Sequence, residues 1–219
     1  MELINFDTSR VIHLISVTRP GGQLYAPDLV RATAERYQFL KGPTVDDLIK
    51  REVKFSVGKF NDFQIQEFAV YSDGLIVTAA ADTDILEAFI EDMLTWGENE
   101  FGFTPIISVG KPERHFESLL IIKSEVDLAK AMTISEEILT ALNALSSSGR
   151  YIEAEFKPSG LAIDCDPQQV KAVRKPMSFG FERRLGISFE ENVFYSKAPL
   201  RTKDHLDLLR LTEDVARRR

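Results

Sequence analysis

Residues 63–77 have the sequence FQIQEFAVYSDGLIV, which predicts a β-hairpin. Polar and apolar side chains alternate through much of the run from Phe63 to Tyr71, as in a strand with one buried face. Asp73-Gly74 then forms a turn signal before the apolar run at 75–77, and glycine accepts a positive φ angle without steric cost. The stretch therefore indicates antiparallel β-structure in this part of the chain.

Further strands are predicted on both sides of this hairpin. Apolar runs at 11–17 and 119–122 are typical of buried strands. Pro158-Ser159-Gly160 separates strand-like runs at 151–157 and 161–165, and Leu185-Gly186 separates runs at 177–183 and 187–195. The C-terminal part of the chain is thus expected to contain two more hairpins.

Apolar residues at helical spacing predict helices between residues 27 and 40, from 84 to 96, from 126 to 145 and from 202 to the C-terminus. Together with the hairpins, these segments predict an α+β fold in which antiparallel hairpins are packed by three to four helices. Glu67-Phe68 before one hairpin resembles Glu155-Phe156 before another, which suggests two similar β-α-β-β halves. We expect an N-terminal half at 1–101, a connecting segment at 102–116 and a C-terminal half at 117–219, with a single compact domain as the equal alternative.

Composition places the chain among ordinary globular proteins. It has 219 residues, 44% of them hydrophobic and 28% charged, which is enough to bury a core without disulfides or structural metals. Cys165 is the one cysteine, so the sequence excludes an intramolecular disulfide and favours a reducing cytoplasm. The first ten residues do not resemble a signal peptide, and no stretch approaches the roughly 18 apolar residues that span a bilayer.

The negative charge of the chain is concentrated in one predicted helix. Seven carboxylates and no Lys or Arg lie between Asp82 and Glu100, while the whole chain has a formal charge of -7. Like charges four residues apart on a helix repel each other, so a cation from elsewhere would relieve them. We predict a partner-binding acidic face made of four residues, and the alternative is a merely solvated helix face. The four residues are Glu87, Glu91, Asp92 and Glu98.

A basic segment lies in the C-terminal half. Residues 168–203 contain eight basic and three acidic residues, a net charge of +5. Five of the basic residues form the second predicted partner-binding region, namely Lys171, Arg174, Lys175, Arg183 and Arg184. Two oppositely charged regions can bind each other in one chain, between copies, or bind separate partners.

These features predict a non-catalytic protein, a structural subunit of a larger assembly that binds a protein partner or a second copy of itself. No cofactor and no metal site is expected, because His13, His115 and His205 have no ligand spacing. The overall acidity argues against nucleic acid as a partner without excluding it.

The alternative prediction is a metal-dependent enzyme acting on a phosphate-bearing substrate. Phosphate-binding glycine loops and the Gly-x-Ser-x-Gly motif are absent from the sequence, so this alternative depends on scattered carboxylates and one lysine. They are Asp164, Asp166, Glu153, Glu155 and Lys157. Cys165 stands between two aspartates, whose negative charge disfavours a thiolate, so it is not expected to act as a nucleophile.

Overall fold

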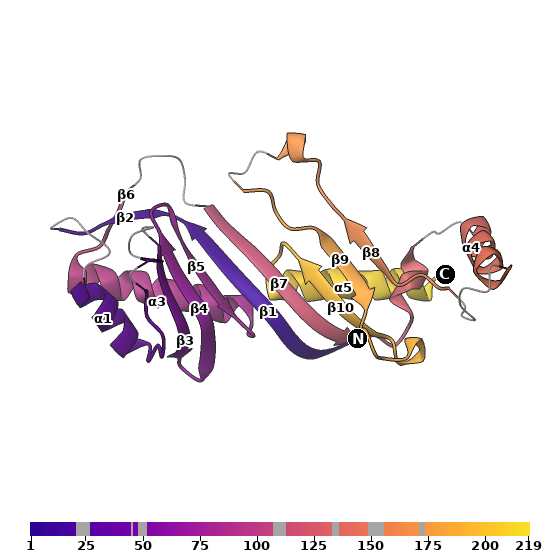
Figure 1. Cartoon of the computed structure of the whole chain (residues 1–219), viewed down its shortest axis with the longest axis horizontal. Coiled ribbons are helices and arrows are strands. Elements are labelled where there is room, and N and C mark those ends of the chain that lie inside the picture. Colours follow the sequence, from indigo (N-terminus) through magenta and orange to yellow (C-terminus); the bar gives the residue numbers. More distant parts are fainter. Residues whose placement is uncertain are drawn as a thin grey trace. The chain divides into compact units, whose positions relative to one another are not determined.

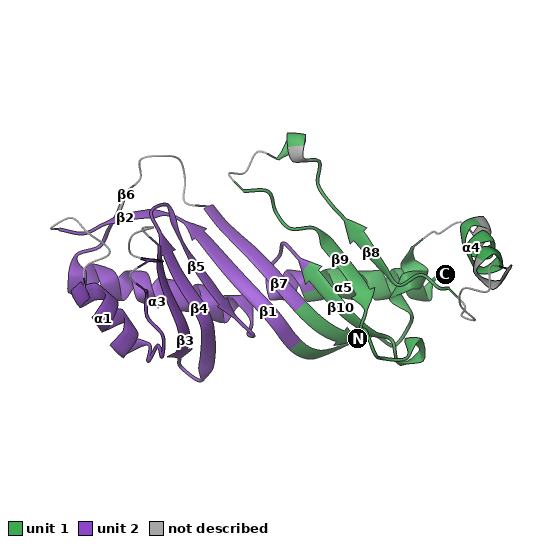
Figure 2. Cartoon of the chain, viewed as in Figure 1, with its two compact units in different colours: residues 1–5, 120–197, 206–219 green, residues 6–119, 198–205 purple. Residues whose placement is uncertain are grey.

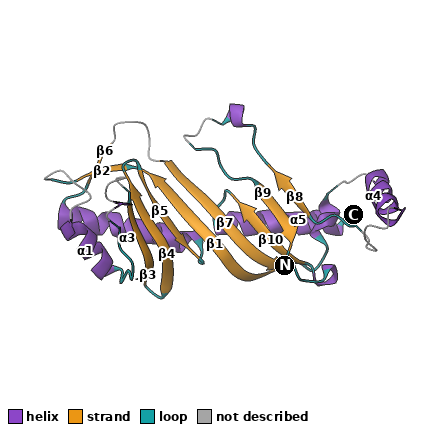
Figure 3. Ribbon diagram, viewed as in Figure 1, coloured by secondary structure: helices purple, strands orange, loops and turns teal. Residues whose placement is uncertain are grey.

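The structure, a computed structural model, describes residues 1–20, 27–44, 46–47, 52–106, 113–132, 136–148, 156–170 and 174–219. It contains helices, strands and three short 3-10 turns (Figures 1 and 3). The strands are β1 Glu2–Leu14, β2 Ser16–Thr18, β3 Val53–Phe60, β4 Phe63–Tyr71, β5 Gly74–Ala79, β6 Thr104–Ile106, β7 Glu113–Lys123, β8 Gly160–Ile163, β9 Phe179–Arg183 and β10 Val193–Ala198. The helices are α1 Pro27–Arg36, α3 Thr83–Phe101, α4 Glu136–Ser148 and α5 Thr202–Arg217.

The α+β prediction is confirmed. Eight strands form a mostly antiparallel sheet in the order β3-β4-β5-β1-β7-β10-β9-β8, and β2 pairs with β6 in a separate two-stranded sheet. The pairs β1–β5, β3–β4, β4–β5, β8–β9 and β9–β10 are all antiparallel.

The chain divides into two compact units (Figure 2). Unit 2 contains residues 6–119 and 198–205, and unit 1 contains residues 1–5, 120–197 and 206–219. Both units are discontinuous in sequence, because β1, β7, β10 and α5 each contribute residues to both. The predicted division at 1–101 and 117–219 stays a prediction.

The predicted hairpin forms, with β4 at its predicted bounds, while β5 extends from Gly74 to Ala79 beyond the predicted run at 75–77. β4 ends at Tyr71, which pairs directly with Gly74, so Ser72 and Asp73 are the two loop residues. The expected reason for Gly74 was wrong, because its φ angle is not positive. Among the described glycines, positive φ angles occur at Gly102 and Gly186. A Cβ on Gly74 would lie 2.8 Å from the carbonyl oxygen of His13. Glycine is needed here because two backbones approach closely.

One strand is longer than the sequence indicated, and another was not predicted. β1 begins at Glu2, nine residues before the predicted run at 11–17, and β3 was not predicted at all. The first residues of β1 are largely exposed or half-buried, so they carry no apolar pattern. β3 has its own alternation, with Val53 and Phe55 buried, and pairs with β4 along its length.

The core of unit 2 is rich in aromatic rings. Phe55 and Phe68 stack at 6.1 Å between ring centroids, Phe68 meets Phe89 edge-on at 5.1 Å, and Tyr37 meets Phe89 at 4.8 Å. Edge-to-face and offset pairs of this kind are the favoured arrangements of aromatic side chains. α3 enters this core through Leu86, Phe89, Ile90 and Met93, the stripe that its sequence spacing predicts.

Both ends of α3 are capped. Asp82 is the N-cap, and its carboxylate accepts a hydrogen bond of 2.9 Å from the backbone N–H of Asp84. Gly102 ends the helix with a φ of 65°, and the N–H of Phe103 then donates to the carbonyl of Gly97. The Phe103 ring packs against Gly97, where a Cβ would lie 2.1 Å from it.

The two halves of the chain share one order of elements. Apart from β2, which belongs to the small sheet, and the 3-10 turns, β1-α1-β3-β4-β5-α3 and β7-α4-β8-β9-β10-α5 each run strand, helix, three strands, helix. Their strand orders in the large sheet are β3-β4-β5-β1 and β8-β9-β10-β7. β5 and β10 each have six residues, ending at Ala79 and Ala198, and the next helices begin at Thr83 and Thr202. Buried positions of these helices correspond: Leu86 with His205, Ile90 with Leu209, and Gly97 with Ala216.

The sequence echo that suggested two halves does not follow this correspondence. It matched the β4–β5 hairpin with residues 155–163, whereas the order of elements matches β4–β5 with β9–β10. Each repeated set also contains one strand more than the β-α-β-β unit that the sequence suggested. The hairpins that resemble each other in turn chemistry are therefore not the equivalent ones.

Replacing Gly97 with alanine tests the packing of Phe103. We expect the change to lower the free energy of unfolding by about 1–3 kcal/mol, because the added methyl overlaps a ring that is 6% exposed. Urea unfolding measures the loss. Gly42→Ala is the matched control, since nothing lies within 4 Å of a Cβ there. A Gly97→Ala protein as stable as wild type would contradict this packing.

Candidate interaction surfaces

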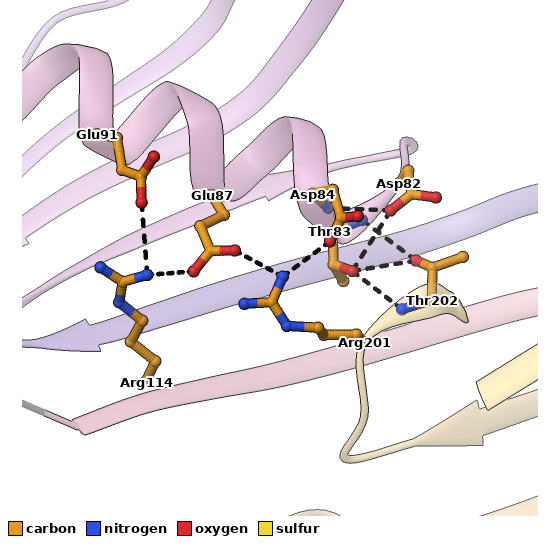
Figure 4. A network of polar contacts seen from close by, with 8 residues as sticks. All are labelled: Asp82, Thr83, Asp84, Glu87, Glu91, Arg114, Arg201 and Thr202. Carbon is orange, nitrogen blue, oxygen red and sulfur yellow. Dashed lines mark hydrogen bonds and ion pairs between the residues drawn. The ribbon is translucent and has the colours of Figure 1, made fainter. Parts of the chain in front are cut away.

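Glu87 is held between two arginines of unit 2 (Figure 4). Its carboxylate contacts the guanidinium of Arg114 on β7 and, at 2.6 Å, that of Arg201, which lies just before α5. The side chain of Glu87 is 14% exposed. Burial by itself would raise the pKa of this carboxyl, but the hydrogen bonds from Arg201 and Arg114 outweigh it and lower the pKa. Glu87 is therefore an internal tie of α3 to β7 and to the start of α5.

The neighbouring residues extend this tie. Arg201 also pairs with Asp84 at 2.9 Å, and its guanidinium lies over the ring of Phe116, 4.3 Å from the centroid. Arg114 reaches Glu91 at 3.4 Å as well, so one arginine relieves the repulsion between Glu87 and Glu91. The cation that the sequence pattern called for comes from the same unit of the same chain.

The first residues of α3 and α5 cap each other. The N–H of Thr83 donates to the hydroxyl oxygen of Thr202 at 3.1 Å, and the N–H of Thr202 donates to that of Thr83 at 2.9 Å (Figure 4). Both threonines are buried. This exchange satisfies one N–H at the start of each helix, where no intrahelical partner exists.

Asp92 is also engaged within unit 2. Its carboxylate lies 3.0 Å from the guanidinium of Arg36 and accepts a hydrogen bond of 2.7 Å from the hydroxyl of Tyr37. Burial, together with the hydrogen bond to Asp92, raises the pKa of Tyr37. Glu98 differs from these residues, since it is exposed and no ion pair is found for it in the described part of the chain.

Thus the predicted acidic face separates into two parts. Glu87, Glu91 and Asp92 neutralise arginines of unit 2, while Glu98 lies near the C-terminal end of α3 together with exposed Glu100. The last turn of α3 contains no basic residue, and negative charge is unfavourable at the negative end of a helix dipole. As a partner-binding surface the acidic face stays a prediction, with Glu98 its least engaged member.

The five residues of the predicted basic region have different environments. Arg183 is buried in unit 1, where it pairs with Asp127 at 2.6 Å, donates to the Phe189 carbonyl at 2.8 Å and lies 4.2 Å from the Phe189 ring centroid. Lys175 pairs with Asp164 at 2.9 Å on the surface. Arg174 and Arg184 are exposed, and Lys171 lies outside the described residues.

The residues of the alternative, enzymatic prediction do not form a described cluster. Asp164 pairs with Lys175, and Asp166 caps a 3-10 turn by accepting from the N–H of Gln168 at 2.9 Å. Lys157 is exposed, while Glu153 and Glu155 lie outside the described residues. Across the ranges that are described, no three His, Cys, Asp or Glu side chains lie together as metal ligands.

His205 is the residue whose environment the sequence misrepresented most. It belongs to a helix start that reads as polar, yet its side chain is fully buried and its Nδ1 lies 2.7 Å from the hydroxyl oxygen of Ser118. Burial lowers the pKa of His205 to about 4. His13 is buried in β1, and burial with nearby Arg114 lowers its pKa.

An apolar surface that the sequence placed on one face of a helix lies open on α4. The predicted helix at 126–145 is divided, since Leu128–Ala131 forms a 3-10 turn and α4 begins at Glu136; Ile134 lies outside the described residues. The exposed fractions are 65% for Ile138, 41% for Leu142 and 68% for Leu145. We call these three residues the α4 stripe.

Two hydrogen bonds determine which side of α4 faces the rest of unit 1. The side-chain amide of Asn143 accepts from the N–H of Phe156 at 2.7 Å and donates to the carbonyl of Phe156 at 3.3 Å. With about 100° per residue, the α4 stripe lies roughly 100–160° around the helix axis from Asn143. The polar side of α4 therefore meets the segment that leads into β8, and the stripe points away from that segment.

A narrow apolar cavity lies in unit 2. It is lined by side chains of α1, α3 and the neighbouring strands, among them Leu29, Phe55 and Met93, and has a volume of about 30 Å³. A cavity that binds benzene has about 150 Å³, so this space fits no more than about two water molecules. It is a packing gap and not a ligand site.

The chain matches no family model, no curated protein and no solved structure. Within the described ranges, no helix has the length and apolar character required to cross a membrane. The surfaces above are therefore the basis for any functional conclusion.

Glu87→Gln tests the internal tie. We expect it to lower the free energy of unfolding by roughly 1–3 kcal/mol, because Arg114 and Arg201 lose the carboxylate between them. Glu98→Gln is the control and should change stability by less than about 0.5 kcal/mol, as at other exposed positions. Equal effects of the two changes in urea unfolding would refute the internal role of Glu87.

His205 makes stability depend on pH. The unfolded chain takes up a proton near the ordinary histidine pKa of 6.5, whereas folded His205 resists it until about pH 4. Stability is therefore lost as pH falls from about 6.5 to 4, by about 3 kcal/mol for this group, and His13 adds to the loss. Unfolding free energies of wild type and His205→Asn across this range should differ in slope, and parallel curves would be evidence against it.

Proposed function

We propose that this protein is a non-catalytic subunit that works by binding another protein. The observation that carries the proposal is the α4 stripe, an apolar surface held outward by the hydrogen bonds of Asn143. Folding normally buries apolar side chains that recur at helical spacing, because their exposure to water is unfavourable. An exposed row of them is typical of a surface that a partner covers.

The charge of α4 favours a protein partner over a membrane or a nucleic acid. Its sequence contains two glutamates at the start and no lysine or arginine. Helices that bind membrane surfaces carry basic residues beside the apolar side, and phosphate backbones also require Lys and Arg. A net charge of -7 adds to the repulsion of either polyanion.

The charged surfaces take a second place in the proposal. Glu98 and Glu100 have unfavourable positions at the C-terminal end of α3, so a basic residue of a partner would stabilise them. Exposed Arg184 is the member of the basic region best placed to meet an acidic partner. Glu87, Glu91, Asp92 and Arg183 contribute mainly by holding their own unit together.

We place this subunit in the cytoplasm as part of a larger assembly. Cys165 is half-buried and free, and a single free thiol is compatible with a reducing compartment. Assembly subunits commonly bury an exposed apolar helix face when the complex forms.

The proposal is tested by the mass of the native complex in extracts of cells that produce the chain. We expect wild type and Thr140→Glu to migrate in a complex heavier than one chain, because Thr140 lies on the Asn143 side of α4, about 60° from that residue. Leu142→Glu places the same charge on the α4 stripe and should release the chain. If all three proteins migrate alike, the stripe is not a binding surface.

A further inference from the structure

We infer that the α4 stripe is covered by a second copy of this chain, in a dimer in which the α4 stripe of each protomer packs against β8 of the other. The inference rests on the proposed function and names the partner. It starts from the correspondence between the two halves of the chain, in which α4 occupies the place of α1, and β8 the place of β3.

In the N-terminal half, side chains of the helix and of the edge strand are buried in one apolar cluster. Leu29 of α1 is 5% exposed, and Val53 and Phe55 of β3 are 3% and 2% exposed; all three belong to one apolar cluster. The side chains of α1 that recur at helical spacing therefore face the sheet, and their equivalents in the other half are expected to need a similar cover.

In the C-terminal half, the corresponding side chains are more exposed, although β8 also contacts the 3-10 turn Leu128–Ala131. Leu161 of β8 pairs with Phe181 of β9 as Phe55 pairs with Phe68, so Leu161 and Phe55 occupy equivalent places. Leu161 is half-buried, and Ile163, two residues along on the same face, is 54% exposed. An apolar helix side and an apolar strand face that match each other are thus present in one chain without burying each other.

The hydrogen bonds of Asn143 explain why the helix does not cover its own strand. They hold the polar side of α4 against Phe156, which lies four residues before β8 begins. The stripe then points away from the strand that would receive it. A second copy removes the conflict, because its β8 can approach the stripe while Asn143 keeps its bonds.

Reciprocal packing also increases the area that the dimer interface buries. The stripe of one helix is short, and a single helix-to-helix contact between two copies falls below the roughly 1,200 Å² of a stable interface. Reciprocal packing forms two equal contacts, in each of which the α4 stripe of one protomer meets β8 of the other. This is the isologous arrangement of a two-fold dimer. Both surfaces are apolar, while each chain has a charge of -7, so added salt should strengthen the dimer by screening repulsion.

The first measurement is the mass of the purified chain by sedimentation over a range of concentrations. We expect a monomer–dimer equilibrium for wild type and for Thr140→Glu. Leu142→Glu and Ile163→Glu should each raise the dissociation constant about tenfold or more, since each places a charge in the apolar contact. Circular dichroism and thermal unfolding confirm that these exposed substitutions leave the fold intact.

The second measurement identifies the contact by disulfide formation in a Cys165→Ser background. Leu142→Cys and Ile163→Cys proteins are prepared separately, mixed and oxidised, so that any bond between the two positions must join different chains. A covalent dimer of one protein with the other is expected in the mixture, with far less dimer when either protein is oxidised alone.

Three results would overturn the inference. They are a monomer at every concentration, a dimer formed by Leu142→Cys alone to the same extent as in the mixture, or a bond within one chain when both cysteines are in the same molecule. If the purified chain is a monomer but Leu142→Glu still releases it from its complex in extracts, the proposed function holds and the partner is a different protein.

Discussion

The ion pairs of Glu87 with Arg114 and Arg201 are the interactions on which the arrangement of unit 2 depends most. Burying a carboxylate that is only 14% exposed would destabilise the fold if the charge were unpaired. Two arginines from distant parts of the sequence pair with it and offset this cost. They join α3 to β7 and to the residues before α5. The reciprocal Thr83–Thr202 hydrogen bonds can form because the starts of both helices are held there.

This internal use of charge changes the meaning of the acidic helix. A run of carboxylates without lysine or arginine suggests a surface prepared for a partner, but much of its charge is balanced by Arg36, Arg114 and Arg201. Buried Arg183 shows the same principle in unit 1, where it meets Asp127 and two aromatic rings. The opposite charges of this chain are thus mixed at short range, and the open apolar side of α4 becomes the stronger evidence of association.

The features that could be predicted from the sequence are those determined by residues close together in the chain. The β4–β5 hairpin and α3 were predicted because alternation, helical spacing and turn chemistry are local. β3 was missed although Val53 and Phe55 alternate with polar residues, so a local signal was present there. The N-terminal part of β1 was missed because strand pairing and not local pattern determines it. His205 was misjudged for a related reason: the hydroxyl that contacts its buried ring belongs to Ser118, 87 positions earlier in the chain.

The sequence by itself determined the α+β class, the acidic face of α3 and the α4 stripe, since each follows from periodic patterns within single elements. Only the tertiary structure decided which charges meet and which apolar side stays open. Ion pairs such as Glu87–Arg201 join residues more than a hundred positions apart, and the outward turn of α4 depends on the contact of Asn143 with Phe156. Pairings of this kind depend on where the fold brings side chains together, which periodicity within a single element does not encode.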